Sequence, residues 1–298
     1  MNLTHLSIRS YFKTLSAIAP KTAASQAAKL FQRPQKRKLR APEKLFYAEY
    51  KSTRIEYDEG SYYTFEWGSP EGELVILVHG WNSNAGSMAG IGHRLARKGY
   101  RVMAIDLPGH GLSVSSTTNL VRMASALEHL LVSLNGQSFS IVSHSMGSAV
   151  SSYALKNTGL AATSLIFLTS PNTLTAIFEE YRDTIGLSQR AYLHLVKRVE
   201  AILGESLEDA SVPGFLNDSA YDRLLLIHDR TDRVIGFEKA VEIYDQTTRS
   251  RYLPLEQMGH YRMLWTEEVI DIVEDEMEGH LAPRYGFASL DYRNKARK

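Results

Sequence analysis

The sequence predicts a doubly wound α/β fold built on a mostly parallel β-sheet. From residue 74 onward, short apolar runs alternate with amphipathic stretches long enough for helices. Apolar strands spaced by helices are typical of a parallel sheet that is covered on both faces. The 298 residues, 44% hydrophobic and 22% charged, suit a globular chain with a large core. The absence of cysteine excludes a disulfide framework, thiol catalysis and thiolate metal sites.

A basic arm, residues 1–42, precedes this pattern. Residues 1–40 hold nine Lys or Arg and no Asp or Glu, which leaves 25 basic and 33 acidic side chains in the rest of the chain. Three interpretations stay open: an organelle transit peptide, a helix on a membrane surface, or a helix packed on the body. We expect an accessory element that takes no part in catalysis. Its apolar residues at helical intervals are Leu3, Leu6, Phe12, Leu15 and Ile18.

An antiparallel hairpin is expected next, from strands over 45–57 and 61–67. Both segments are rich in Tyr, Phe, Ile and Thr, and Asp58-Glu59-Gly60 between them is typical of a turn. The strands of the parallel sheet are expected at 74–78, 101–107, 139–143, 164–169, 223–228 and 251–255. Helices are expected near 85–98, 119–135, 147–158, 237–246 and 262–277. We therefore predict one domain over 43–280, followed by a C-terminal tail, 281–298.

The segment 171–220 interrupts the alternation of strands and helices. It contains no strand-like run, and several of its apolar residues follow helical spacing on one face. A helical insertion that acts as a lid is the simplest interpretation. Packing of the lid itself explains its apolar residues as well as contact with a substrate does. Those that could line an acyl pocket are Ile177, Phe178, Tyr181, Leu187, Tyr192, Leu195 and Val199.

The segment 139–148 carries the most informative pattern. An apolar strand leads into Ser143-His144-Ser145-Met146-Gly147, and a helix is expected to follow. Small residues two positions before and after Ser145 permit a tight strand-to-helix turn that lifts its hydroxyl above the sheet. A helix N-terminus at this point favours developing negative charge. Ser145 is therefore the candidate nucleophile, and a serine-rich helix cap is the alternative.

Two further strands end in loops that can shape a site beside this serine. His79-Gly80-Trp81 follows the strand 74–78, where backbone N–H groups can face an oxyanion. We expect the N–H groups of Trp81 and Met146 to be the donors and His79 to hold the loop. The segment 106–113, Asp-Leu-Pro-Gly-His-Gly-Leu-Ser, ends the next strand, and its Asp106 and His110 are interpreted as structural.

An acid and a base are offered by the last two predicted strands. Asp229 and Asp232 follow the strand 223–228, and His260 follows 251–255. In open α/β sheets, sites are built at the carboxyl ends of the strands. Ser145, an aspartate and His260 should therefore meet at one edge of the sheet, which favours nucleophilic catalysis over coincidence.

With these motifs the chain resembles the serine-hydrolase branch of the α/β-hydrolase fold superfamily, near monoacylglycerol lipases, lysophospholipases and small esterases. The resemblance covers about residues 60–277 and implies that Asp232, which lies two positions before Val234, is the acid of the triad. The chain departs from the family pattern at Ser143, where a glycine is usual, and at His228-Asp229, where His-Gly is common.

The implied reaction is a two-step acyl transfer. Ser145 attacks an ester with an apolar acyl group, His260 transfers the proton, Asp232 orients His260, and Trp81 and Met146 bind the oxyanion. Cleavage of a C–C, thioester or amide bond stays open, as does a catalytically silent hydrolase fold that binds a ligand. We expect a cytoplasmic protein, with contact to a membrane surface through the arm as an alternative.

Other classes of ligand lack a signature. There is no phosphate-binding loop, and Gly90-Ile-Gly-His-Arg-Leu95 lacks the third glycine of a dinucleotide site. No His-Glu-x-x-His sequence or close histidine pair points to a metal. We therefore expect no cofactor, no metal and no nucleic-acid partner.

Overall fold

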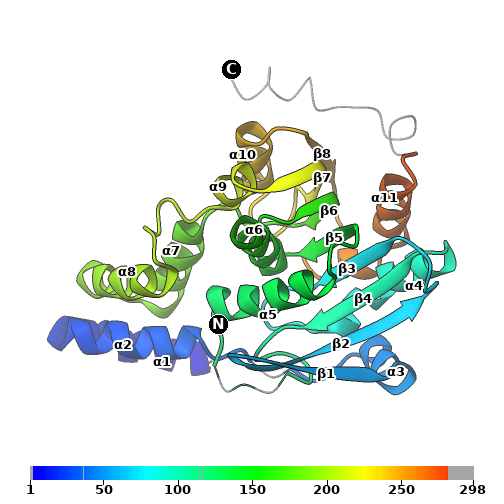
Figure 1. The fold of residues 1–298 in the computed structure, drawn as a ribbon. Helices are drawn as coiled ribbons and strands as arrows, with labels where there is room; N and C mark the ends of the chain where they lie inside the picture. The colour runs from blue at the N-terminus through cyan, green and yellow to red at the C-terminus, as the bar shows by residue number, and fades with distance from the viewer. Residues whose placement is uncertain (1–2, 36, 114, 116, 281–298) are drawn as a thin grey trace.

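The computed structural model describes residues 3–35, 37–113, 115 and 117–280, which contain an eight-stranded sheet in the order β1-β2-β4-β3-β5-β6-β7-β8 (Figure 1). β1 (Ser52–Tyr57) and β2 (Gly60–Gly68) pair antiparallel, β2 pairs antiparallel with β4, and the other pairs are parallel. The predicted fold class is thereby confirmed. The remaining strands are β3 (Leu74–Val78), β4 (Arg101–Asp106), β5 (Phe139–His144), β6 (Ala161–Leu168), β7 (Ala220–Asp229) and β8 (Ser250–Leu255).

Helices cover both faces of the sheet, so that its central strands are apolar on both sides. In β3, Ile76 belongs to one buried cluster and its neighbour Leu77 to the other, because successive side chains point to opposite faces. One face is covered by α5 (Leu120–Ser133), α6 (Met146–Thr158) and α10 (Glu238–Gln246). The other is covered by α3 (Ala41–Glu49), η1 (Ala85–Met88), α4 (Ala89–Arg97), η2 (Arg262–Trp265) and α11 (Glu267–Met277).

The first predicted strand, 45–57, is wrong in its first part. Residues 45–49 belong to α3, and β1 begins only at Ser52. The helix starts with Pro42 in its first turn, and the Glu43 carboxylate accepts the Arg40 N–H at 2.8 Å. These signals of a helix start outweigh the aromatic character of the segment. The boundary that we expected at residue 42 falls inside this helix.

The insertion between β6 and β7 is helical. It contains α7 (Leu174–Ile185), α8 (Gln189–Leu203) and α9 (Val212–Asn217). Each helix begins after a residue whose hydroxyl oxygen accepts a backbone N–H of the first turn. These residues are Thr173, Ser188 and Ser211. Figure 1 shows α7 and α8 set apart from the sheet, beside the two N-terminal helices.

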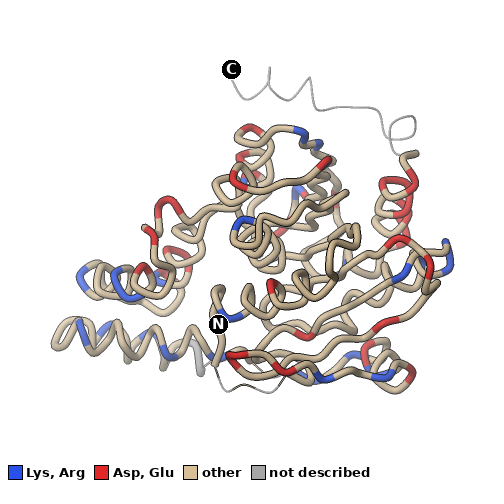
Figure 2. The backbone as a smooth tube through the Cα atoms, viewed as in Figure 1, with Lys and Arg blue, Asp and Glu red and all other residues tan. Residues whose placement is uncertain are grey.

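The basic arm consists of α1 (Leu3–Ile18) and α2 (Pro20–Phe31), and α2 packs against α8. Its small residues Ala23 and Ala27 are fully buried, and the Tyr181 hydroxyl donates to the Ala27 carbonyl at 2.9 Å. Of the apolar residues that recur at helical intervals in the arm, Phe12 is buried, whereas 79% of Ile18 is exposed. Figure 2 shows Lys and Arg along both helices without Asp or Glu.

Within the part of the chain that is described, no helix combines the length and the apolar character needed to cross a membrane. The predicted tail, 281–298, lies outside the described residues.

Candidate active site

Ser145 occupies the turn between β5 and α6. Its φ of 53° and ψ of −126° lie in a region that residues other than glycine rarely adopt, at a cost of about 1–3 kcal/mol. The surrounding backbone holds this conformation, since the Ser145 N–H donates to the Leu168 carbonyl of β6 at 2.9 Å. The strained turn places the serine at the N-terminus of α6, as the sequence predicts.

Close backbone packing around the turn explains its small residues. A Cβ on Gly147 would lie 2.5 Å from the Val78 carbonyl oxygen, and a Cβ on Gly80 would lie 2.9 Å from the Ser145 Cβ. Both glycines therefore let the loop after β3 approach the start of α6. At Ser143 the chain has a serine where a glycine is usual, and its hydroxyl forms a 2.7 Å hydrogen bond with that of Ser151.

The structure brings Ser145, His260 and Asp232 together in one hydrogen-bonded chain. His260 Nε2 lies 3.1 Å from Ser145 Oγ, and His260 Nδ1 lies 2.8 Å from Asp232 Oδ2. The side chains of His260 and Asp232 are 3% and 0% exposed, so the pair is shielded from water. With Nδ1 donating to the carboxylate, Nε2 is free to accept the serine proton. This is the geometry of an activated nucleophile.

The two candidate acids have different partners. Burial disfavours the charge of Asp232, but hydrogen bonds from His260 and from the N–H groups of Val234 and Ile235 bring its pKa below the ordinary value. Asp229 instead accepts the N–H and hydroxyl of Thr231 and the N–H of Gly259. Asp229 therefore ties the loop after β7 to the residue before His260, and it does not contact the imidazole.

Two buried histidines surround this chain of hydrogen bonds. His144 Nε2 donates to the His260 carbonyl at 2.8 Å, and burial lowers the pKa of His144 to about 3. His228 Nε2 donates to the Ile235 carbonyl at 2.9 Å, and burial lowers its pKa as well. Both imidazoles are thus neutral donors that hold backbone carbonyls of the loops carrying His260 and Asp232.

The two predicted oxyanion donors belong to the two segments that meet at Ser145, the start of α6 and the loop after β3. Met146 is the first residue of α6, so its N–H has no acceptor within the helix. Trp81 follows Gly80 in the loop that approaches Ser145. His79 holds this loop as expected: its Nε2 accepts the Leu107 N–H at 3.1 Å, and its Nδ1 donates to the Gly80 carbonyl.

Asp106 and His110 act as structural residues, as predicted. The buried Asp106 carboxylate accepts the N–H groups of Ala85 and Leu112 and the Tyr47 hydroxyl. Burial raises the pKa of Asp106 to about 6, although these hydrogen bonds oppose the shift. His110 Nε2 accepts the N–H of Asn82, in the loop after β3, at 3.1 Å.

His110 should make stability depend on pH. Burial lowers its pKa to about 4, against 6.5 in the unfolded chain, so only the unfolded state binds the proton between these values. Its contribution is complete above pH 6.5 and is lost as the pH falls toward 4, by about 1.4 kcal/mol per pH unit. In urea unfolding at pH 7, 6 and 5, His110→Gln should lose less stability per pH unit than the unchanged chain. Equal slopes would contradict this assignment.

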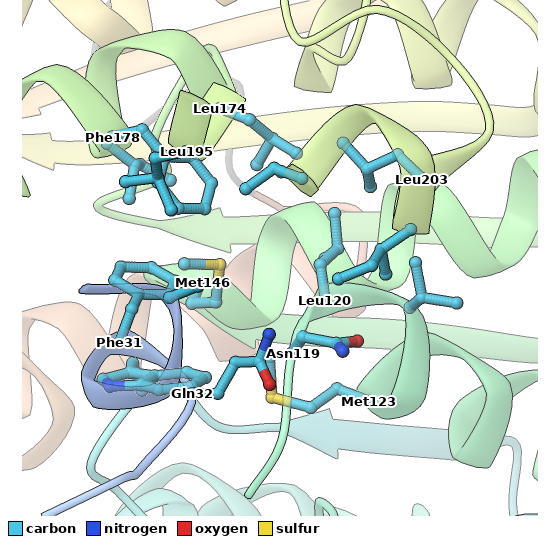
Figure 3. Close-up of a pocket in the computed structure, with 16 residues that line it drawn as sticks. Phe31, Gln32, Asn119, Leu120, Met123, Met146, Leu174, Phe178, Leu195 and Leu203 are labelled. Carbon is cyan, nitrogen blue, oxygen red and sulfur yellow. The ribbon is translucent and has the colours of Figure 1, made fainter. Parts of the chain in front are cut away.

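An apolar pocket opens next to Met146 and Trp81 (Figure 3). It encloses about 570 Å³, its open mouth included, and none of its lining residues is charged. Of the residues predicted for an acyl pocket, four line it, whereas Tyr181, Leu187 and Tyr192 do not. The residues lining the pocket are Ala28, Phe31, Gln32, Trp81, Asn119, Leu120, Val121, Met123, Met146, Leu174, Ile177, Phe178, Leu195, Val199, Ile202 and Leu203.

The arm packs on the body and also contributes to this pocket, whereas its having no part in catalysis stays a prediction. Phe31 and Gln32 at the end of α2 line the pocket. The signal was present in the sequence: Ala23, Ala27 and Phe31 recur every four residues and share one face of a helix. This face lines the pocket because α2 packs against the insertion. A local sequence pattern does not predict such packing between distant segments.

In the described part of the chain, no group of three or more His, Asp or Glu side chains is placed to hold a metal ion.

Comparison with known proteins relates the chain to hydrolases. A model of the alpha/beta hydrolase family matches residues 75–289. Serine hydrolase-like protein 2 of Homo sapiens is 28% identical over 218 residues, which are 72% of this chain and 65% of the relative. A serine hydrolase-like protein of Dictyostelium discoideum is 40% identical over 91 residues, 29% of this chain and 25% of the relative. The alignments thus span between a quarter and about two thirds of these relatives.

A solved structure of similar fold is an esterase of Pyrococcus furiosus. Its TM-score is 0.62 with 20% sequence identity, and the alignment covers 84% of this chain and 98% of that structure. At this identity the likeness concerns the fold alone.

Proposed function

The chain belongs to the alpha/beta hydrolase family, and from this we propose that it is a serine hydrolase that cleaves carboxylic esters through an acyl-enzyme on Ser145. One observation carries the proposal: the continuous hydrogen-bonded chain from Ser145 Oγ through His260 to the buried Asp232 carboxylate. A fold that only binds a ligand has no need for a strained serine, a base and an acid in one line.

The reaction takes place in two steps. His260 Nε2, 3.1 Å from Ser145 Oγ, accepts the hydroxyl proton as the oxygen attacks the ester carbonyl. The protonated imidazole then gives this proton to the departing alcohol, and the acyl group stays on Ser145. A water molecule, deprotonated by the same imidazole, then attacks the acyl-enzyme. The bond between the acyl carbon and Ser145 Oγ breaks, the imidazolium returns its proton to Oγ, and the acid is released. Asp232 stabilises the imidazolium in both steps and keeps Nδ1 as the donor.

The N–H groups of Met146 and Trp81 would hold the oxyanion. Met146 offers a donor at the N-terminus of α6, where the helix dipole adds to the attraction of negative charge. Trp81 offers the second donor from the loop beside Gly80. Both donors are backbone groups on tightly packed segments, which suits stabilisation without rearrangement.

The pocket favours an uncharged, apolar acyl group. Its wall is aromatic and aliphatic apart from the amides of Gln32 and Asn119. A charged acyl group would lose its hydration there without finding a partner. The insertion would act as a lid, because α7 and α8 supply seven of the lining residues.

Cleavage of a thioester, amide or C–C bond is the second candidate, since the same three groups support it. A panel of p-nitrophenyl esters from acetate to palmitate, together with labelling by a fluorophosphonate, separates the candidates. We expect labelling and turnover of the esters, with the best kcat/KM for an intermediate chain. Labelling without turnover of any ester would favour the second candidate. The absence of both would favour a silent, ligand-binding fold.

A further inference from the structure

The N-terminal helices lie outside the segment that the family model matches, which begins at residue 75. Nevertheless, α2 forms part of the pocket beside Ser145. Figure 3 shows Phe31 next to Met146 and facing Phe178 and Leu195 of the insertion. The wall of the pocket is therefore assembled from a segment before the hydrolase core and a segment inserted into it.

The Phe31 ring is the centre of an aromatic cluster. It stacks on Trp81 with ring centroids 5.5 Å apart and 20° between the planes. Its centroid also lies 4.6 Å from that of the Phe178 ring and 4.9 Å from that of the Tyr181 ring, which it meets edge to face. The ring thus joins the loop after β3 that carries Trp81 and Asn82, here called the oxyanion loop, to α7, and it lines the same pocket as Met146, the residue after Ser145.

Hydrogen bonds hold the backbone both before and after Phe31. On one side the Ala27 carbonyl accepts the Tyr181 hydroxyl at 2.9 Å. On the other side the Gln35 N–H donates to Asn82 Oδ1 at 2.6 Å, and Arg37 Nε donates to the Asn82 carbonyl at 3.0 Å. Asn82 directly follows Trp81, so the arm and the oxyanion loop are held together.

The guanidinium that holds this loop is itself fixed. Arg37 pairs with both carboxylate oxygens of Glu43, at 2.5 and 3.0 Å, and the Glu43 side chain is fully buried. Such a two-point ion pair on a buried carboxylate is directional. Phe31 is therefore part of a rigid wall and not the end of a loose arm.

We propose that Phe31 is a specificity-determining residue, and that the N-terminal arm completes the acyl-binding pocket of this hydrolase. This inference rests on the proposed function. An acetyl group occupies only the end of the pocket at Ser145, whereas a longer acyl chain must pass along the Phe31 ring. Removal of the ring therefore takes more apolar contact away from a long-chain ester than from an acetate ester.

The test compares Phe31→Ala with Phe12→Ala in the full chain. Phe12 is also a buried aromatic residue of the arm, but it does not line the pocket. The ratio of kcat/KM for p-nitrophenyl octanoate to that for the acetate should fall about tenfold in Phe31→Ala, mainly through KM. In Phe12→Ala it should stay at the value of the unchanged chain. An equal fall in both variants, or in neither, would overturn the proposal.

Two additions keep the test independent of folding and of the reaction. Phe31→Leu retains an apolar side chain and should lower the same ratio less than Phe31→Ala. Calorimetric binding of octanoic acid should weaken in Phe31→Ala and not in Phe12→Ala. If no ester is turned over but octanoic acid shows this difference, the pocket assignment holds and the proposed reaction fails. If esters are turned over and neither readout separates the variants, the role of Phe31 fails alone.

Discussion

Ser145→Ala should abolish ester turnover and labelling by a fluorophosphonate. Removing the nucleophile of a serine hydrolase lowers kcat on the order of 10⁶-fold, since no other group can carry the acyl intermediate. The fold should persist, because the Ser145 side chain supports only its bond to His260, while the backbone N–H to Leu168 is unchanged. The measurement is single-turnover kinetics with p-nitrophenyl butyrate, with the melting temperature as the check of folding.

Ser143→Ala and Ser148→Ala are the matched controls. Both serines lie within three residues of Ser145 and are fully buried. Ser143 bonds to Ser151, and Ser148 Oγ has no hydrogen-bond partner among the described residues. Neither hydroxyl is bonded to His260, so both variants should remain labelled and active. Labelling that persists in Ser145→Ala and disappears in one of these variants would move the nucleophile to that position.

The sheet and the turn at Ser145 could be predicted because both depend on local patterns. The run Leu74–Val78 is apolar throughout and only five residues long, which favours a strand that is covered on both faces. Likewise Gly147 directly after Met146 leaves room for the loop of β3. Since the carboxyl ends of parallel strands share one edge of the sheet, the meeting of Ser145 and His260 followed from the order of strands.

What the sequence did not predict depends on contacts between distant segments. Phe31 reaches the site only because α2 packs against α8, and the hairpin was extended too far because aromatic residues at 45–49 suit a strand as well as a helix. The pairing of Arg37 with Glu43 and its bond to the Asn82 carbonyl also join separate segments. Such contacts have no periodicity that could be recognised in advance.

The choice between Asp229 and Asp232 is decided by what each carboxylate accepts. Asp232 Oδ2 lies 2.8 Å from His260 Nδ1, whereas Asp229 accepts from Thr231 and Gly259. An asparagine at 232 keeps the size of the side chain but removes the charge, and its amide can turn a donor toward the imidazole. The imidazole would then adopt the tautomer that carries a proton on Nε2, which cannot accept the serine proton.

Asp232→Asn should therefore lower kcat on the order of 10⁴-fold at pH 7, with little change in KM. Asp229→Asn should stay within about tenfold of the unchanged chain, because it weakens only the anchoring of the loop before His260, and the size of that effect is typical of one hydrogen bond. Measurement of kcat for both variants with the same ester, alongside the melting temperature, compares the two directly. Since the Asp229 carboxylate accepts the Gly259 N–H, Asp229→Asn should lower the melting temperature clearly while kcat changes little. If Asp229→Asn lost activity to the larger extent while Asp232→Asn stayed active, the acid of the triad would have to be reassigned to Asp229.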